Sequence, residues 1–139
     1  MADSVFYKIY NDLVNAAKGV ISAKYIFLKD RPNVGNDGSP MAKFMVIDLP
    51  STIRDSVIGS QKTLLTTTGV IYAFVQSRSN NTLDVNAMGD FTDSIVALFP
   101  ISGTYCVATN PSVRMMGSDG QGYQLTTITF DLYSRWRKL

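Results

Sequence analysis

The stretch YQLTTITFDLYSR, residues 123–135, decides the fold of this chain of 139 residues. Leucine, isoleucine, phenylalanine and tyrosine side chains alternate along it with threonines and Asp131. A period of two is the pattern of a β-strand whose side chains point alternately to the two faces of a sheet. The stretch therefore predicts a long strand with one buried face and one wet face.

Two further strands are predicted upstream. Residues 64–79, LLTTTGVIYAFVQSRS, are rich in the threonine, branched and aromatic residues that favour strands. Gly69 within this run predicts a bend or a bulge. Residues 103–109, GTYCVAT, predict a strand that a long turn joins to the last one. We expect Cys106 in this apolar run to be buried, because a free thiol packs like a small hydrophobic group.

The first of two predicted helices runs from about residue 4 to residue 20. Asp3 or Ser4 can cap its free N–H groups. Its apolar residues recur at three- and four-residue steps, as on one face of a helix, and are Val5, Phe6, Ile9, Leu13, Val14, Ala17 and Ile21.

The second predicted helix covers residues 83–99. Thr82 can cap its start, Pro100 follows its end, and Gly89 weakens its middle by about 1 kcal/mol relative to alanine. Its apolar stripe consists of Leu83, Ala87, Met88, Phe91, Ile95, Leu98 and Phe99.

Two more strands are predicted between the first helix and residue 50. AKYIFLK, residues 23–29, and MAKFMVIDLP, residues 41–50, have strand composition. Prolines, glycines and asparagines fill the segment between them, so we expect a long hairpin arm over about residues 29–41 and an antiparallel pairing of the two strands. Residues 51–63 show no clear period.

The predicted order is helix, strand, strand, strand, helix, strand, strand (α-β-β-β-α-β-β). It lacks the strict alternation of strands and helices that a parallel doubly wound sheet needs. The sequence therefore predicts one α+β domain over residues 1–139, with a mostly antiparallel sheet and two helices on one face. The other, threonine-decorated face is left for water, a ligand or a neighbouring subunit.

The composition argues against catalysis. The chain has no histidine and no glutamate, and Cys106 is its single cysteine. General acid–base chemistry, an activated thiol and a zinc site normally need those residues. We therefore predict no catalytic residue, no metal site and no cofactor. The net charge of +2 and the 17% of charged residues leave neutral polar surface that is easily buried against partners.

Three motifs have a weak functional interpretation beside a structural one. Asp90 and Asp93 could share a helix face as a metal or catalytic pair, but such aspartates are usually solvated. Residues 117–122, GSDGQG, resemble a phosphate loop, yet no helix follows them, which favours a turn. Residues 30–38, DRPNVGNDG, lack the spacing of a calcium loop.

The C-terminal tail, residues 134–139, is basic and contains a tryptophan. Cations beside an aromatic ring can bind nucleic acid, but tryptophan and arginine are also favoured anchors of protein interfaces, and we prefer that interpretation. No apolar run approaches the roughly 18 residues of a membrane span, so no membrane association is expected. The chain is expected to fold in the cytoplasm.

The order of elements resembles that of bacteriophage tail-terminator and tail-completion (head–tail neck) proteins. The resemblance rests on VFYKIYNDLVNAAKGVI, the long-armed hairpin, GVIYAFVQSRS, LDVNAMGDFTDSIVALF and a closing hairpin that ends in TTITFDLYSRW. It covers nearly the whole chain as a pattern of elements, without a diagnostic motif.

The resemblance implies a structural virion protein without enzymatic activity. Such a protein would be made in the bacterial cytoplasm and would form a ring of six or twelve subunits between the portal or connector and the tail, around the DNA channel. Cyclic rings use two different complementary patches on each subunit. The candidate interface residues are Arg31, Asn33, Asn36, Asp37, Arg114, Met115, Met116, Arg135, Trp136 and Arg137. The loop at residues 109–122 could reach an adjacent neck, portal or tail protein.

Two other classes stay open. A small monomeric binding module would grip a peptide or single-stranded nucleic acid on an open sheet face. It predicts that Tyr72, Phe74 and Tyr123 are displayed on that face, whereas the ring interpretation predicts that neighbouring subunits bury them. An enzyme would need Asp90 and Asp93 to converge in a cleft with a metal ion.

Overall fold

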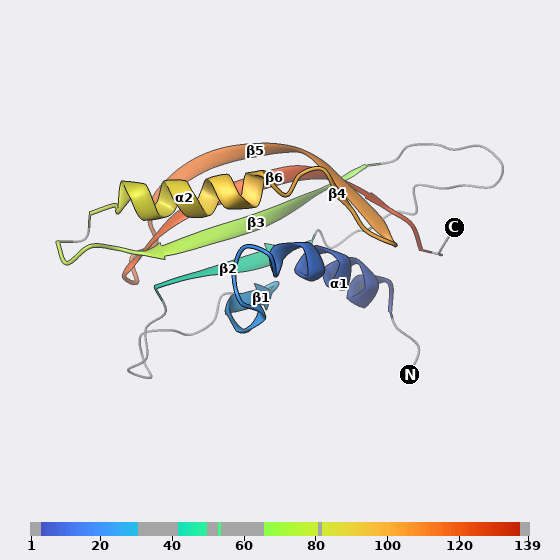
Figure 1. Ribbon diagram of the computed structural model, residues 1–139, viewed down its shortest axis with the longest axis horizontal. Helices are drawn as coiled ribbons and strands as arrows, with labels where there is room; N and C mark the ends of the chain where they lie inside the picture. Colours follow the sequence, from blue (N-terminus) through green and yellow to red (C-terminus); the bar gives the residue numbers. More distant parts are fainter. Residues whose placement is uncertain (1–3, 31–41, 50–52, 54–65, 81, 137–139) are drawn as a thin grey trace.

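The chain folds around one curved, six-stranded sheet with two helices (Figure 1). The structure is a computed structural model, and it describes residues 4–30, 42–49, 53, 66–80 and 82–136. The strand order is β1-β2-β3-β6-β5-β4. The strands are β1 (Ile26–Leu28), β2 (Lys43–Asp48), β3 (Thr67–Gln76), β4 (Ile101–Ser102), β5 (Cys106–Ser118) and β6 (Tyr123–Ser134). The predicted α+β class is confirmed.

Four of the five strand pairings are antiparallel, as predicted: β2 with β3, β3 with β6, β5 with β6, and β4 with β5. Strand β6 lies at the centre and alternates as its sequence predicts over Ile128, Phe130 and Leu132. Leu125 and Tyr133, which were predicted to share their face, lie on the other face instead. Thr126, Ile128, Phe130, Leu132 and Ser134 are buried, and the residues between them are only half-buried.

The predicted antiparallel pairing of the first two strands is wrong. Strand β1 pairs with β2 in parallel, with Ile26 opposite Met45 and Leu28 opposite Ile47. A parallel pair needs a crossover instead of a hairpin, so the two strands are not a hairpin pair. The first strand is also shorter than predicted, because residues 23–25 form the 3₁₀ turn η1 (Ala23–Tyr25). Residues 31–41 lie outside the described part of the chain.

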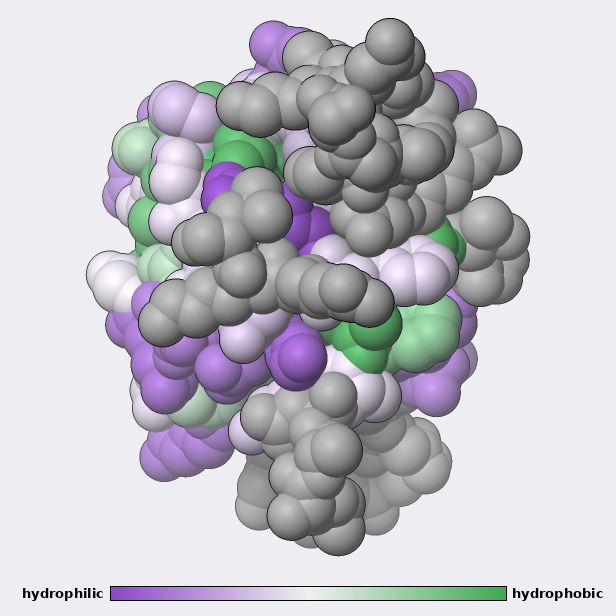
Figure 2. All heavy atoms as spheres, turned by 90° about the vertical axis from the view of Figure 1, so that its right-hand side faces the viewer, coloured by the Kyte–Doolittle hydropathy of each residue, from purple (hydrophilic) through white to green (hydrophobic). Residues whose placement is uncertain are grey.

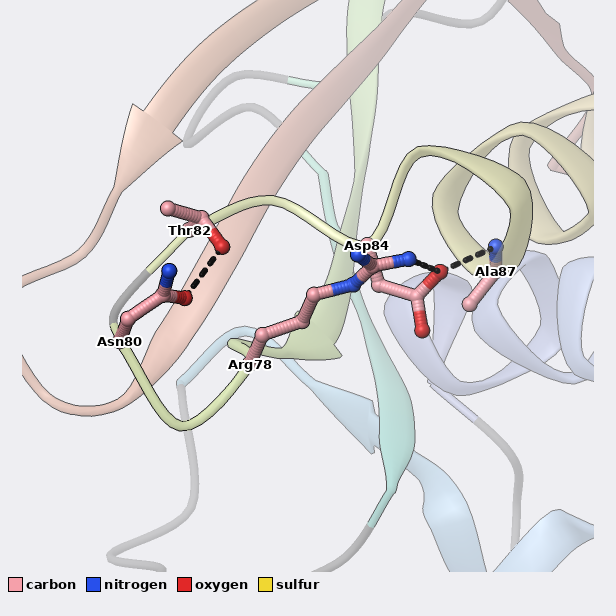
Figure 3. A network of polar contacts seen from close by, with 5 residues as sticks. All are labelled: Arg78, Asn80, Thr82, Asp84 and Ala87. Atoms are coloured by element: carbon pink, nitrogen blue, oxygen red, sulfur yellow. Dashed lines mark hydrogen bonds and ion pairs between the residues drawn. The ribbon is translucent and has the colours of Figure 1, made fainter.

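Helix α1 (Val5–Ala17) begins at the predicted cap, since the Ser4 hydroxyl accepts a hydrogen bond from the Tyr7 N–H at 3.1 Å. The N-cap of helix α2 (Val85–Val96) lies two residues after the predicted cap, Thr82. Its cap is Asp84, whose carboxylate accepts from the Ala87 N–H at 3.2 Å. Figure 3 shows Arg78 beside the same carboxylate, at 3.8 Å.

Both helices cover the same face of the sheet, as predicted. Ile9 and Leu13 of α1 belong to one continuous core with Phe91 and Ile95 of α2. Helix α2 contacts β3 and β6, whereas α1 contacts β1 and β4, which are the two edge strands. The sheet therefore curls around α1, while α2 lies along its centre (Figure 1).

The second face of the sheet is not simply open. Phe44, Val46, Phe74 and Tyr123 form a small buried core of their own. The Phe44 ring stacks on Phe74 with 4.5 Å between centroids, and it meets the Tyr123 ring edge-on at 5.1 Å. The expectation that Phe74 and Tyr123 are displayed for a ligand is wrong, and so is the expectation that neighbouring subunits bury them, because this chain buries both rings itself.

Gly69 does not mark a bulge, since β3 pairs with β6 in continuous register from Thr67 to Gln76. It makes room for an aromatic ring instead. A Cβ atom at this position would lie 2.6 Å from two carbons of the Phe130 ring on the neighbouring strand.

The long turn predicted after residue 109 is mostly strand. Strand β5 continues to Ser118 with irregularities between Thr109 and Ser112 and between Met115 and Gly117. Asn110 sits in the first with a φ of 56° and donates from its side-chain amide to Asp131 at 3.0 Å. The bulge accommodates Pro111 within the strand, because proline has no N–H that could pair with β6.

Candidate assembly surface

The outer half of β5 is an unpaired sheet edge within the described part of the chain. Strand β4 covers only the beginning of β5, where Ile101 lies opposite Ala108 and Ser102 opposite Val107. Beyond that point, from Thr109 to Ser118, β5 pairs with β6 on one side only. Unpaired N–H and C=O groups along an edge form a template for another chain.

This edge displays large apolar side chains. The exposed fractions are 48% for Val113, 62% for Met115 and 49% for Met116. Val113 and Met115 lie opposite the buried residues Ile128 and Thr126, so they point to the face that α2 covers. Exposed apolar residues gathered in one place mark an interaction site more often than single ones do.

An apolar groove of about 170 Å³ separates this edge from α2. Its walls come from the start of α2 and from the middle of β5, and Thr126 of β6 lies between them. The lining residues are Leu83, Val85, Met88, Gly89, Thr92, Asp93, Val113, Met115 and Thr126. Val85 at its rim is 65% exposed.

Two threonines that line this groove have a hydroxyl group without a hydrogen-bond partner among the described residues. Thr92 is 8% exposed and Thr126 is 1% exposed, and the hydroxyl oxygen of each is buried and unpaired. A buried hydroxyl without a partner costs roughly 1–3 kcal/mol.

The predicted interface residues fall into three groups. Arg114, Met115 and Met116 lie together on the exposed half of β5. Arg135 and Trp136 follow the end of β6, at the opposite end of that strand from the β5–β6 turn. The other predicted residues, Arg31, Asn33, Asn36, Asp37 and Arg137, lie outside the described part of the chain.

Met115 was predicted from the sequence as an interface residue, but most of the other residues that line the groove were not. Val113 stands in the segment PSVRMM, where a valine in a supposed turn gave a signal for an exposed strand. Nothing in the sequence indicated that Gly89, Thr92 and Thr126 would line one groove, because two come from a helix and one from a strand 34 positions further along.

Hydrogen bonds of the Tyr105 backbone, beside Cys106, join α1 to the residue that follows β6. The Asp12 carboxylate accepts from the Tyr105 N–H at 2.6 Å, and the Arg135 N–H donates to the Tyr105 carbonyl at 2.6 Å. Cys106 is fully buried, as predicted. Burial, together with the neighbouring Asp12 carboxylate, raises the pKa of its thiol to about 12.

A wider hollow of about 560 Å³ lies between α1 and the β4–β5 turn. Its acidic lining residue is Asp12, which already binds the turn through Tyr105. A side chain at Gly103 would collide with Asp12, so the turn and the helix approach closely here. The hollow therefore forms where the β4–β5 turn is hydrogen-bonded to α1.

The motifs with weak functional interpretations have structural roles where the structure describes them. The carboxylate of Asp119 accepts from the N–H groups of Gln121 and Tyr123, and Gly120 and Gly122 have positive φ angles, so residues 119–122 form a turn as predicted. Gly117 and Ser118 belong to β5 instead. Asp90 and Asp93 are exposed on α2. Among the described residues, no group of three acidic, cysteine or histidine side chains is placed to hold a metal ion.

Phe6, Tyr7 and Trp136 are exposed at the end of the molecule where α1 begins and β6 ends. In Figure 2, which views this end, the residues drawn in colour form small green patches among purple and white ones.

No described helix is long and apolar enough to span a membrane.

A scan against protein-family models finds no match for the chain, and a search of curated proteins finds none either.

Proposed function

We propose that this chain is a structural protein of a tailed bacteriophage. It forms a ring at the head–tail neck or at the tail terminus, joins the connector to the tail and surrounds the DNA channel. In this role it is not an enzyme and binds no cofactor. Its partners are copies of itself and the adjacent neck, portal or tail proteins, with DNA passing through the lumen.

The observation that carries the proposal is the half of β5 that no other described strand pairs with on its outer side, with Val113, Met115 and Met116 exposed along it. A monomeric protein normally protects such an edge with charges, short strands or a covering loop. Here Arg114 is the only charged residue from Thr109 to Ser118. An edge of this kind is suited to permanent coverage by a neighbouring subunit.

The phage role is supported by the order of elements. The helix, the central strands, the second helix and the closing hairpin occur in the order that the resemblance to tail-terminator proteins rests on, whereas the long-armed hairpin that it also includes is not supported, because β1 and β2 are parallel. A closed ring also needs a second, different patch on each subunit. The outer edge of β1, at the other side of the sheet, and the exposed side of α1 are available for it.

The test is light scattering and electron microscopy of the purified chain, alone and with portal-bearing particles. Closed rings, free or seated on particles, support the proposal. The variant Met115→Lys should abolish them, because it places a charge on the apolar edge, whereas Ser94→Lys adds the same charge to an exposed position of α2 outside the groove and should not. A chain that stays monomeric in both conditions and binds a peptide or an oligonucleotide would be a binding module instead.

A further inference from the structure

We infer that strand β1 of a second copy of this chain adds to the free edge of β5, antiparallel to it, so that the sheets of neighbouring copies join into one. The inference rests on the proposed self-association and names the two strands that meet. Both strands leave backbone groups unpaired at an outer edge of the sheet, and these groups fit one another.

The hydrogen bonds between β5 and β6 determine which backbone groups of β5 face outward. At one end of the pair, the Arg135 N–H donates to the Tyr105 carbonyl at 2.6 Å, and at the other end the Asp119 N–H donates to the Tyr123 carbonyl at 2.8 Å. Bonded and non-bonded pairs alternate along an antiparallel ladder, and β6 pairs with β3 without a break in register. The odd-numbered residues of β6 therefore bond to β5.

Val113 and Met115 lie opposite even-numbered residues of β6. Their N–H and C=O groups consequently point away from β6, to the edge that no other described strand covers. Arg114 between them lies opposite an odd-numbered residue and bonds to β6 instead. The edge thus offers a donor and an acceptor at every second residue, which is what an added strand pairs with.

Strand β1 also has an outer edge with unpaired groups. The Lys29 N–H donates to the Ile47 carbonyl at 2.8 Å, so Lys29 faces β2. The direction of the backbone groups alternates along a strand, so Leu28 and Ile26 face outward. The Ile26 N–H bonds within the 3₁₀ turn η1. The Leu28 N–H and the Ile26 carbonyl are left without a partner among the described residues.

These groups fit one antiparallel register. With Leu28 opposite Val113, the two residues can exchange both hydrogen bonds of a bonded pair. The Leu28 carbonyl already accepts from the Asp30 N–H at 2.8 Å, but its second lone pair can accept another bond. Ile26 then lies opposite Met115, and the outward Met115 N–H meets the free Ile26 carbonyl. Three hydrogen bonds therefore join the copies.

The two neighbouring registers provide fewer bonds. In one, Leu28 lies opposite Pro111, which has no N–H to donate. In the other, Ile26 lies opposite Gly117, which pairs with an odd-numbered residue of β6 and therefore faces inward. The register with Leu28 opposite Val113 is thus favoured.

The side chains of the two strands match on both faces of the joined sheet. Leu28 is 45% exposed and follows the buried Ile26 by two positions, so it points to the helix-covered face, as Val113 does. The same register places Arg114 opposite Phe27 on the other face. A guanidinium group beside an aromatic ring is a favourable pair.

The joined sheet extends from copy to copy. Because the apolar side chains of both strands lie on the helix-covered face, neighbouring copies keep their helices on the same side. Strands β1 and β5 lie towards opposite edges of the sheet (Figure 1). Each copy therefore leaves one edge free for the next, and the contact is heterologous, as in a ring or a filament.

The first experiment removes single N–H groups with proline and measures association by light scattering. Met115→Pro and Leu28→Pro should each weaken association at least about tenfold. Circular dichroism should still show folded subunits, because an edge strand tolerates proline where the N–H faces outward. Met115→Thr and Leu28→Thr, which also shorten the side chain but keep the N–H, should weaken association less than the matching proline.

Arg114→Pro is the control for the direction of the backbone groups. It removes a hydrogen bond to β6 within the subunit, so it should lower the melting temperature far more than Met115→Pro does. Equal melting temperatures of these two variants would contradict the assigned direction and overturn the inference.

Cross-linking tests the register without proline. A chain that carries both Leu28→Cys and Val113→Cys, oxidised after assembly, should give a ladder of disulfide-linked species beyond the dimer, because its two cysteines meet two different neighbours. Leu28→Cys combined with Arg114→Cys should not cross-link, because position 114 points to the opposite face. Cys106 is buried and does not compete.

The outcomes separate this inference from the proposed function. Rings that form equally well in both proline variants, or rings in which the cysteines at positions 28 and 113 do not link, would overturn the inference and leave the proposed function standing. A parent chain that never associates would overturn both.

Discussion

The substitution Gly69→Ala should destabilise the protein, although alanine is favoured over glycine in most strands. Removing the glycine gains roughly 0.5–1 kcal/mol by restricting the unfolded chain. The new methyl group, however, would lie 2.6 Å from two carbons of the Phe130 ring. Phe130 is 1% exposed and packs against Phe99 with 5.3 Å between ring centroids, so its ring has no free space to move into. Overpacking of this kind costs about 1–3 kcal/mol.

The net loss should be about 1–2 kcal/mol of unfolding free energy, since the steric cost exceeds the entropic gain. Urea unfolding followed by circular dichroism measures it. The same substitution in a Phe130→Leu background is the control, because leucine has no ring at the site of the collision. There Gly69→Ala should be neutral or stabilising, which corresponds to a coupling energy of at least 1 kcal/mol. A Gly69→Ala protein as stable as the parent, or equal costs in both backgrounds, would refute the reasoning.

Three further predictions concern local anchors and the buried thiol. Asp84→Ala should cost about 1 kcal/mol of unfolding free energy, because it removes the cap of α2. Asp90→Ala, on the exposed side of the same helix, should stay within about 0.5 kcal/mol of the parent. Urea unfolding measures both variants, and equal losses would contradict the capping role of Asp84. Asp12→Ala should cost about 1.5–3 kcal/mol in the same assay, because the Tyr105 N–H loses a charged acceptor, and Asp12→Asn should cost less because an amide oxygen can still accept. The pKa of the Cys106 thiol is about 12 in the folded chain, against an ordinary value of 9.0, so its contribution to stability is complete below pH 9 and should fall as the pH rises from 9 towards 12. At pH 8 a thiol reagent should label the chain only as fast as the chain unfolds. Immediate labelling would show that the thiolate is accessible.

The sequence was sufficient wherever one local pattern determines the structure. The alternation in β6 predicted its buried face, and the helical stripes predicted that Ile9 and Phe91 would be core residues. The same patterns do not contain the direction of a strand. Strand β1 has three residues, too few to specify a partner, so its parallel pairing with β2 depends on long-range packing that the local sequence does not encode.

The turn residues misled for a different reason. Asn110 and Pro111 interrupt a strand pattern, and such a pair commonly predicts a turn. In β5 they occupy an edge bulge, where a positive φ and a missing N–H are tolerated. The same misassignment affected the candidate assembly surface. Met115 and Met116 were predicted as interface residues on a loop, whereas they lie on an exposed strand edge.

The groove itself could not be predicted from the sequence. Thr92 is a polar residue in the stripe of α2, and Thr126 continues the alternation of β6, so both have ordinary local explanations. Only the three-dimensional packing brings their unpaired hydroxyls to the same groove beside Gly89.

The most direct test of the central claim is native mass spectrometry of the purified chain over a range of concentrations, with electron microscopy of the same samples. The proposed role predicts closed rings of six or twelve subunits around an open channel, and it predicts that Met115→Lys prevents them. A monomer at every concentration, also when portal-bearing particles are added, would contradict it, and so would a two-fold dimer that buries the β5 edge.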